Sequence, residues 1–316
     1  MASINTNIAA NLALRTLGTS QSQIAKAENR ISTGYRVTEA KDDAAYWSIA
    51  TTMGSDGKAM SAVQDALALA SATAGVAYAA INSTIKLANH MKERLIAARE
   101  PGVDLAKIQS DITSLQAQMI STVKSASFSG ENWLMIDSTT GADLKKSAVS
   151  SFGRDDKGNV VVGTIELKIY DASTGDTIGL LDNNPSAGQS KGLLDRMLPS
   201  ASGSQWQVSG VNISQLDHSP AGIAELDSII TGVDETIGKL TGAATEFGAK
   251  KGRYDLQRNF MTDMRMAVDA GVSQLVDADM SAESTRLQAL QTRESLGVQS
   301  LSIANKSAQA ILGLFQ

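Results

Sequence analysis

Apolar residues recur every three or four positions near both ends of the chain, the spacing of a helix face that packs on a partner helix. Near the C-terminus the line of positions is Leu287, Leu290, Glu294, Gly297, Leu301, Ala304, Ala308, Ile311 and Phe315, extended backward by Met280 and Val276. Near the N-terminus it is Ala10, Ala13, Leu17, Ser20, Ile24, Ala27 and Ile31, with Ile4, Ile8 and Leu12 on nearby positions. Because such narrow stripes cannot bury themselves, we predict that the terminal helices pair with each other or with other copies of the chain. The alternative is that both pack on one globular core.

A longer line with the same spacing runs from Met53 to Leu95. At roughly 1.5 Å per residue this helix would be about 75 Å long, which exceeds what a compact domain covers. Asp42 and Asp43 stand where it begins, and we interpret them as capping residues. Pro101 and Gly102 then turn the chain. A shorter amphipathic pattern from Leu105 to Val123 completes a predicted antiparallel helical hairpin.

The middle of the chain loses the helical period. Ile165, Leu167 and Ile169 alternate with polar residues, which is the spacing of a β-strand. We expect a turn at Asp171–Gly175 and a return strand at Thr177–Leu181. Trp206, Val208, Val211 and Ile213 suggest one more strand or ribbon. We therefore predict a small, mainly β insertion from Ser138 to Ala221.

Helical spacing returns at Ile223 and is unbroken to Phe247, after which charges intrude before the C-terminal line. The predicted fold class is mainly α, with long antiparallel coiled-coil helices from both chain halves and a small mainly-β insertion in the middle. The two halves complete one structure only if the chain ends come back together.

Composition favours thin helical contacts over a thick core, since hydrophobic residues make up 42% of the chain but aromatic residues only 4%. The net charge of −5 is spread along the chain, so no basic patch indicates a nucleic-acid partner. No apolar run approaches the roughly 20 residues of a membrane span, so no membrane partner is expected. The N-terminus lacks the pattern of a secretory signal. The absence of cysteine excludes disulfides and thiolate chemistry.

Residues that could carry catalysis do not cluster in the sequence. The two histidines, His90 and His218, have no second ligand at metal-binding spacing. No phosphate loop, nucleophile elbow or zinc-protease motif occurs. Asp171–Asp176 faintly resembles a calcium loop but lacks its downstream glutamate, so a turn is the simpler interpretation. We predict no enzyme activity, no catalytic residue, no cofactor and no metal.

Several separated motifs resemble those of bacterial flagellin. They are Ser3–Asn7, Arg30–Val37, Ala40–Ala45, Phe128–Leu134, Val276–Glu283, Leu287–Gln291 and Ala304–Leu312. The resemblance covers roughly the first 137 and the last 95 residues and omits the middle. The short insertion and the absence of cysteine resemble the flagellins of alphaproteobacteria such as rhizobia.

This resemblance implies three domains. Residues 1–35 with 275–316 would form a terminal coiled-coil domain lining the inner filament tube, 36–137 with 222–274 a helical rod domain, and 138–221 a variable outer domain. The chain would polymerise into the flagellar filament for swimming motility, with termini that fold on assembly. The expected assembly interface comprises Ile4, Ile8, Leu17, Ile24, Ile31, Leu287, Leu290, Leu301, Ala304, Ile311 and Phe315.

The resemblance also implies the partners and the location. The chain would bind itself and paralogous flagellins, an export chaperone, the filament cap and hook-junction proteins. It would be extracellular, on the flagellum, exported by the flagellar type III system without a cleavable signal peptide.

Three other interpretations remain open at this point. A hook-filament junction protein shares similar termini but does not form long filaments. A type III-secreted effector or membrane translocator would need a long apolar hairpin or an enzymatic group of residues. An enzyme housed in the insertion would need a converging acid, base or nucleophile.

Overall fold

The computed structural model describes residues 7–140, 143–184 and 190–313, which fall into two compact units. One unit comprises Met1–Lys58 with Arg265–Gln316, and the other comprises Ala59–Met264. The mainly-α fold class predicted from the sequence is confirmed, because long helices dominate and the strands are confined to the middle of the chain. The predicted division into three domains stays a prediction.

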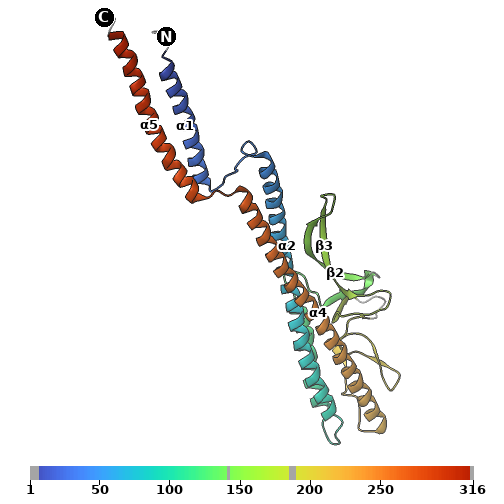
Figure 1. The fold of residues 1–316 in the computed structure, drawn as a ribbon. Helices are drawn as coiled ribbons and strands as arrows, with labels where there is room; N and C mark the ends of the chain where they lie inside the picture. Colours follow the sequence, from blue (N-terminus) through green and yellow to red (C-terminus); the bar gives the residue numbers. More distant parts are fainter. Residues whose placement is uncertain (1–6, 141–142, 185–189, 314–316) are drawn as a thin grey trace. The chain divides into compact units, whose positions relative to one another are not determined.

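In the first unit, helices α1 (Ile8–Thr33) and α5 (Met280–Gly313) lie side by side (Figure 1). The side chain of Asn7 caps α1 by accepting a hydrogen bond from the backbone N–H of Ala10 at 3.0 Å. Gly34 ends the helix with a φ of 76°, a left-handed conformation that glycine adopts without strain. At the start of α5, the Asp279 carboxylate accepts the N–H of Ser281 at 2.9 Å.

The predicted backward extension of the C-terminal line through Met280 and Val276 is wrong. Helix α4 (Pro220–Val276) ends before α5 begins, and the two residues fall on different helices. Met280 is exposed, whereas Val276 is buried in a small cluster with Val37 and Ala50. The physical reason is that Asp279 caps a new helix, so the chain cannot keep one helical phase through this point.

Helix α2 (Ala44–Ala97) begins earlier than the line of positions that predicted it. The carboxylate of Asp43 caps it, accepting the N–H groups of Ala45 and Tyr46 at 3.1 Å. The neighbouring Asp42 does not cap α2; its carboxylate accepts two backbone N–H groups of the preceding turn, from Thr38 and Glu39. The predicted capping role is therefore filled by one aspartate of the pair, because adjacent side chains cannot converge on one helix end.

In the second unit, α2 runs antiparallel to α4 and to α3 (Leu105–Ser125). Every position of the predicted α2 line from Met60 to Leu95 is buried. Ser71 donates a 2.7 Å hydrogen bond to Asp255 of α4, and Arg94 pairs with Asp111 of α3 at 3.6 Å. The sequence period therefore located this three-helix core correctly.

Between Met135 and Trp206, the described residues form six strands in three separate two-stranded sheets. They are β1 (Met135–Asp137), β2 (Leu144–Arg154), β3 (Val160–Tyr170), β4 (Leu181–Asn184), β5 (Leu198–Pro199) and β6 (Gln205–Trp206), with 3-10 turns at Ser138–Thr140 and Val208–Gly210. β1 pairs with β4 in parallel, whereas β2–β3 and β5–β6 are antiparallel.

Strand β3 confirms the alternating pattern around Ile165, but its predicted return strand is wrong. β3 pairs with the preceding strand β2, and the segment after the turn contributes only a single bridge, Tyr170 to Thr177. Serine, lysine and glycine dominate β2, so its buried positions are too few and too small to give a strand signal in the sequence.

The strand predicted over Trp206–Ile213 is also wrong beyond its first residue. Val208, Val211 and Ile213 are buried, but their backbone groups bond to side chains instead of a partner strand. Gln116 of α3 donates to the Val208 carbonyl at 3.0 Å, and Gln109 accepts the Ile213 N–H at 2.8 Å. Two glutamine side chains thus satisfy the buried backbone where a sheet would otherwise be needed.

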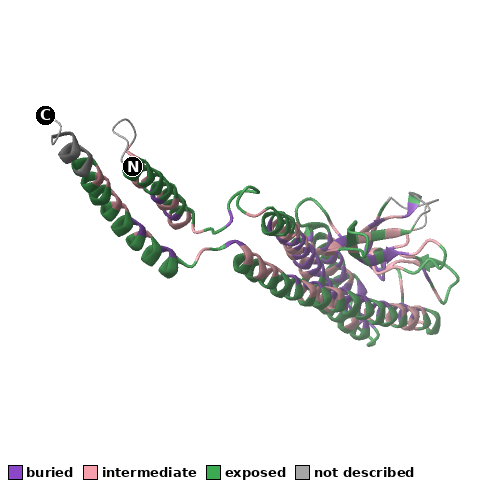
Figure 2. Ribbon diagram, turned by 45° about the horizontal axis from the view of Figure 1, so that its top comes forward, coloured by how far each residue is buried: buried purple, intermediate pink, exposed green. Residues whose placement is uncertain are grey.

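The insertion shares one hydrophobic core with the helices of its unit. Leu134, Ile165 and Leu167 belong to the same buried cluster as Met119 and Phe247. Figure 2 shows buried residues concentrated in this unit, whereas α1 and α5 are exposed over most of their surface.

Helix α2 is also more apolar than the sequence analysis expected. Its length and a mean hydropathy of 1.3 over an 18-residue window would allow it to cross a membrane. Its line from Leu67 through Ala74 and Ile81 to Ala88 is buried within the unit, as in the core helix of a water-soluble bundle.

Candidate assembly site

The two terminal helices face each other along the lines that the sequence predicted. On α1 the line Ala10, Ala13, Leu17, Ser20, Ile24, Ala27 and Ile31 is buried or half-buried, and Gln23 and Arg30 beside it are half-buried too. On α5 the line Glu283, Leu287, Leu290, Glu294, Gly297, Leu301 and Ala304 is likewise buried or half-buried. Both sets keep the three-four spacing, so we call this contact the terminal seam.

Contacts at both ends and in the middle show that the helices are antiparallel. The Asn7 amide donates to the Ala304 carbonyl at 3.1 Å. A Cβ placed on Gly297 would lie 3.6 Å from the Leu17 side chain, an ordinary van der Waals distance, so these two positions are neighbours across the helix pair. At the opposite end, Arg30 reaches Glu283. The line of contacts fixes which residues of the two chain ends are neighbours.

The residues predicted for the assembly interface fall into three groups. Leu17, Ile24, Ile31, Leu287, Leu290, Leu301 and Ala304 lie on the terminal seam. Ile8 lies off the seam and is exposed. Ile4 and Phe315 are outside the described residues, and Ile311 lies in α5 with a side chain that is not described. Their membership of an interface between subunits stays a prediction.

Sequence reasoning missed an ion pair on the seam. A guanidinium nitrogen of Arg30 lies 2.7 Å from a carboxylate oxygen of Glu283, whose side chain is 11% exposed. The available signal was the position of Glu283, seven residues before Leu290 on the same helical line. An acidic residue on an otherwise apolar line calls for a cation on the facing helix.

Sequence reasoning also missed a backbone contact between the segments that follow α1 and precede α5. The N–H groups of Arg36 and Val37 both donate to the Val276 carbonyl, at 2.6 and 3.3 Å, and Ala278 donates to Gly34 at 2.8 Å. We call this contact the linker bridge. It joins the bases of the two terminal helices.

Both terminal helices retain a second apolar face after pairing. Ile8 is 72% exposed, and Leu296 and Ile303 are 59% and 68% exposed. Residues two apart on a helix point roughly 160° away from each other. Because Ile8 is two residues from Ala10 and Ile303 two from Leu301, these side chains point away from the terminal seam.

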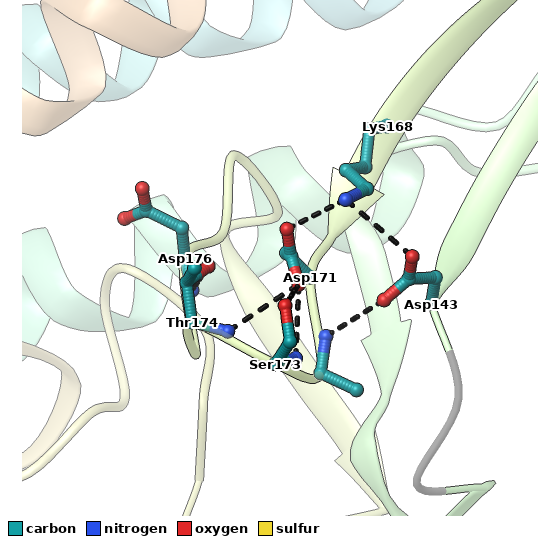
Figure 3. Close-up of polar contacts among 7 residues, drawn as sticks. Asp143, Lys168, Asp171, Ser173, Thr174 and Asp176 are labelled. Atoms are coloured by element: carbon teal, nitrogen blue, oxygen red, sulfur yellow. Dashed lines mark hydrogen bonds and ion pairs between the residues drawn. The ribbon is translucent and has the colours of Figure 1, made fainter.

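The Asp171–Asp176 segment forms the predicted turn. One oxygen of Asp171 accepts the N–H groups of Ser173 and Thr174, and the other lies 2.6 Å from the Lys168 ammonium (Figure 3). These hydrogen bonds, that from Lys168 foremost, hold the pKa of the Asp171 carboxyl well below its usual range. The carboxylate of Asp176 points away from this group (Figure 3).

A lysine, not an open coordination position, therefore lies beside the carboxylates of this turn. Lys168 also lies 3.4 Å from Asp143. Among the described residues, no three His, Cys, Asp or Glu side chains are placed to hold a metal ion. His90 is exposed beside Glu93, and His218 lies 3.0 Å from the Glu100 carbonyl.

An open cavity of about 690 Å³ lies between this turn, the loop that precedes β5, and α4. Most of its charged groups form ion pairs, several of them with residues outside the cavity lining. Arg196 and Lys239 both contact Glu235, at 2.8 and 3.3 Å, and Lys168 pairs with Asp171. Such pairing is typical of structural surface contacts and does not resemble a catalytic group of residues.

Known proteins resemble this chain over its whole length. The chain matches the family model for the bacterial flagellin N-terminal helical region over residues 4–139, and that for the C-terminal helical region over 230–315. It is 41% identical to Flagellin C of Rhizobium meliloti (strain 1021) over 331 residues, which span both chains entirely. It is 37% identical to a flagellin of Brucella melitensis biotype 1 over 318 residues, again over both full chains. Among solved structures, it is similar to Bacillus cereus flagellin with a TM-score of 0.39 and 18% identity, covering 65% of this chain and 94% of that chain.

The long helices, paired chain ends and strand-containing middle define a mainly helical protein whose two chain ends pack against each other. The matched family models and relatives show that the chain belongs to the bacterial flagellin family and is of the rhizobial type. It is a structural subunit of the extracellular flagellar filament, and the family implies self-assembly and a role in motility. The relatives named as flagellins favour this identity over that of a hook-filament junction protein.

Proposed function

We propose that subunits polymerise through the α1–α5 pair, and that these two helices become ordered on assembly. The observation that supports this proposal is the second apolar face. Ile8, Leu296 and Ile303 remain largely exposed after the helices have paired, at 72%, 59% and 68%. Exposed apolar side chains that repeat on a chain end indicate a further partner.

The energetics favour a neighbouring subunit as that partner. An isolated pair of helices buries little apolar area, and each ordered residue costs about 1–2 kcal/mol of backbone entropy. Burying one large aliphatic side chain contributes about 1.5–3 kcal/mol. Neighbouring subunits that cover Ile8 and Ile303 would add the burial that the free pair lacks. The contact would be heterologous and repeat without closure, as a helical filament requires.

The three-domain division is part of this proposal. Residues 1–35 with 275–316 would line the filament interior, 36–137 with 222–274 would form its rod-like layer, and 138–221 would lie outermost. The predicted interface residues Ile4, Ile311 and Phe315 would extend the contact of the first domain toward the chain ends. We assign no catalytic role to any part of the chain.

We also propose the partners and the export route from family membership. Before assembly, the exposed apolar faces of α1 and α5 would need cover, and an export chaperone would supply it. After export by the flagellar type III system, without removal of a signal peptide, the subunit would meet the filament cap, the hook-junction proteins and paralogous flagellins.

The substitution Leu301→Asp tests the assembly role of the terminal seam. A carboxylate on this half-buried position would face the apolar side of α1, so we expect no filaments in seeded polymerisation. Circular dichroism should show that the helices of residues 59–264 remain. The matched control is Ser302→Asp, which places the same charge one residue off the seam. Filaments of normal length from the Leu301 variant would show that this seam is not part of the assembly interface.

A further inference from the structure

The ion pair of the terminal seam is out of place in an apolar contact. Glu283 is 9% exposed, and one of its carboxylate oxygens is buried with no hydrogen-bond partner in the part of the chain that the structure describes. The other oxygen lies 2.7 Å from Arg30, and Arg286 is more distant, at 3.9 Å. A buried ion pair contributes little net stability, because desolvation offsets the attraction. We therefore expect the ion pair to affect a property other than the stability of the helix pair.

The rest of the terminal seam does little to fix how the two helices align. Its other members are mainly alanine, leucine, isoleucine and glycine, spaced alternately three and four residues apart on both helices. A shift by seven residues would again place apolar side chains against apolar side chains. Small side chains such as Ala10, Ala13 and Ala27 interlock little with the facing helix, so they offer little steric resistance to such a shift.

The ion pair, in contrast, tolerates no such shift. A shift by seven residues in one direction places Leu290 opposite Arg30, and in the other it places Gln23 opposite Glu283. Either arrangement leaves a buried carboxylate without its cation, which is far more costly than a mismatch between two apolar groups. The linker bridge joins backbone groups alone, from Arg36 and Val37 to Val276 and from Ala278 to Gly34, so it does not distinguish one side chain of the terminal seam from another.

We propose that Arg30 and Glu283 set the register of the α1–α5 pair. The proposal rests on the assembly role proposed for that pair. Register determines the relative positions of Ile8 on one helix and of Leu296 and Ile303 on the other. A subunit in a shifted register would present its apolar residues in a different arrangement and would not fit its neighbours. The ion pair thus selects the assembly-competent subunit.

Disulfide cross-linking can report the register directly, because the natural chain contains no cysteine. Leu17→Cys with Gly297→Cys reports the observed register, since the two positions are in contact. Leu17→Cys with Ala304→Cys, and Leu17→Cys with Leu290→Cys, report shifts of seven residues in the two directions. Each pair is introduced into the full chain, which is oxidised during growth on filament seeds, and links are counted over incorporated and free subunits together. With Arg30 and Glu283 intact, we expect at least tenfold more link in the observed register.

The change Arg30→Leu with Glu283→Leu should lower that ratio at least fivefold, since no register then leaves a buried carboxylate at position 283 without its cation. The matched control is Gln21→Leu with Glu294→Leu, which removes a 3.1 Å contact that is more exposed and should leave the ratio unchanged. An unchanged ratio in the Arg30/Glu283 variant would overturn the proposal. Links between chains, rather than within one chain, in the unaltered background would instead contradict the pairing on which the proposed function rests.

If the leucine variant does not polymerise, a charge exchange decides the question. Glu283→Gln alone and Arg30→Leu alone should raise the critical concentration for seeded growth at least tenfold. Arg30→Glu combined with Glu283→Arg restores opposite charges and should return it to within threefold of the original value. An exchange variant as defective as the single variants would show that the pair does not act through mutual recognition, and would overturn the proposal.

Discussion

At the scale of single residues, the core of the second unit contains a polar atom that gains nothing from burial. Tyr254 on α4 is fully buried, and its hydroxyl has no hydrogen-bond partner among the described residues. Burial also raises the pKa of this phenol. A buried hydroxyl without a partner costs roughly 1–3 kcal/mol. The ring fills space that the packing needs, whereas the hydroxyl does not contribute.

Tyr254→Phe should therefore stabilise residues 59–264 by about 1 kcal/mol, because the ring remains and the unsatisfied group is removed. Chemical unfolding of the monomer, followed by circular dichroism, measures the change. The control is Tyr254→Leu, which removes ring volume as well and should destabilise by about 1–3 kcal/mol. A loss of stability in the phenylalanine variant would mean that the hydroxyl is hydrogen bonded in solution.

Asp195, in the loop before β5, is a second buried polar residue. Burial, followed by the nearby Asp182 carboxylate, raises the pKa of Asp195 to about 6. One oxygen accepts the Asp182 N–H at 2.8 Å, and the other has no partner within the described residues. The folded state thus holds the proton of Asp195 more tightly than the unfolded chain does.

The raised pKa of Asp195 determines the direction in which folding stability changes with pH. Since the folded state binds more protons between roughly pH 4 and 6, the stabilisation by protonated Asp195 is present below pH 4 and is lost as the pH rises through about 6. Asp195→Asn keeps an acceptor for Asp182 and removes the charge, so we expect it to stabilise the protein at pH 7.5 and to have little effect at pH 4. Unfolding measured at both pH values tests this. A variant equally stable to the original at both would contradict it.

Asp171 provides a control of the opposite sign. Hydrogen bonds to its carboxylate lower its pKa, so they stabilise the folded state above the unfolded pKa of roughly 4 and are lost on acidification. Asp171→Asn should therefore destabilise the protein at pH 7.5, with a difference that shrinks as the pH falls. The two aspartates separate burial from hydrogen bonding as causes of pH dependence within the same insertion.

At the scale of elements, α2 depends on small side chains in its buried face. Ala74, Ala77 and Ala88 are all almost completely buried on the line that faces α3 and α4. Small residues at these positions allow the helix backbones to approach closely. This explains how a chain with few aromatic residues can still form a close-packed core.

Ala77→Leu should destabilise residues 59–264 by about 1–3 kcal/mol, because three additional carbon atoms must fit into a packed interior. Ala79→Leu is the matched control, since the same change falls two residues away on the exposed side of the same helix. It should change stability by no more than about 0.5 kcal/mol. Thermal unfolding of the two variants tests the difference; equal effects would contradict the packing described for α2.

The helices could be predicted from the sequence because burial on one face repeats over many turns. The line from Met60 to Leu95 and both faces of the terminal seam follow from spacing alone. Strand β2 could not, because six of its eleven residues are serine, lysine or glycine and its few buried positions give no alternating apolar pattern. The buried segment around Val211 could not be assigned either, since its hydrogen-bond partners are glutamines about a hundred residues away in the sequence.

The candidate site divides in the same way. Spacing predicted the seam residues such as Leu17 and Leu290, but not the partner of Glu283, because an ion pair depends on the register of two distant helices. The linker bridge consists of backbone hydrogen bonds, which leave no pattern in the side chains. What escaped prediction is therefore the set of contacts that fix alignment.

At the scale of the whole molecule, the insertion is joined to its unit more closely than an outer appendage would need. Ile165, Leu167 and Val211 belong to the same buried cluster as Leu240 and Phe247 of α4. The far end of the β2–β3 hairpin is different, because Val160, Val161 and Val162 are all more than half exposed. The segment between Ser138 and Ala221 thus contains a part that completes the core and a part that does not.

Two deletions should separate these parts. Replacing residues 153–161 with Asn-Gly would close the hairpin between Phe152 and Val162, which are already paired, through a turn suited to antiparallel strands. We expect the melting temperature to change by less than about 3 °C and filaments to form normally. Deleting residues 138–221 would uncover Phe247 and Leu240, and we expect loss of cooperative unfolding and no filaments. If the larger deletion folded and assembled, the insertion would be an independent outer domain, and the shared core would not be needed by the helices that carry the filament.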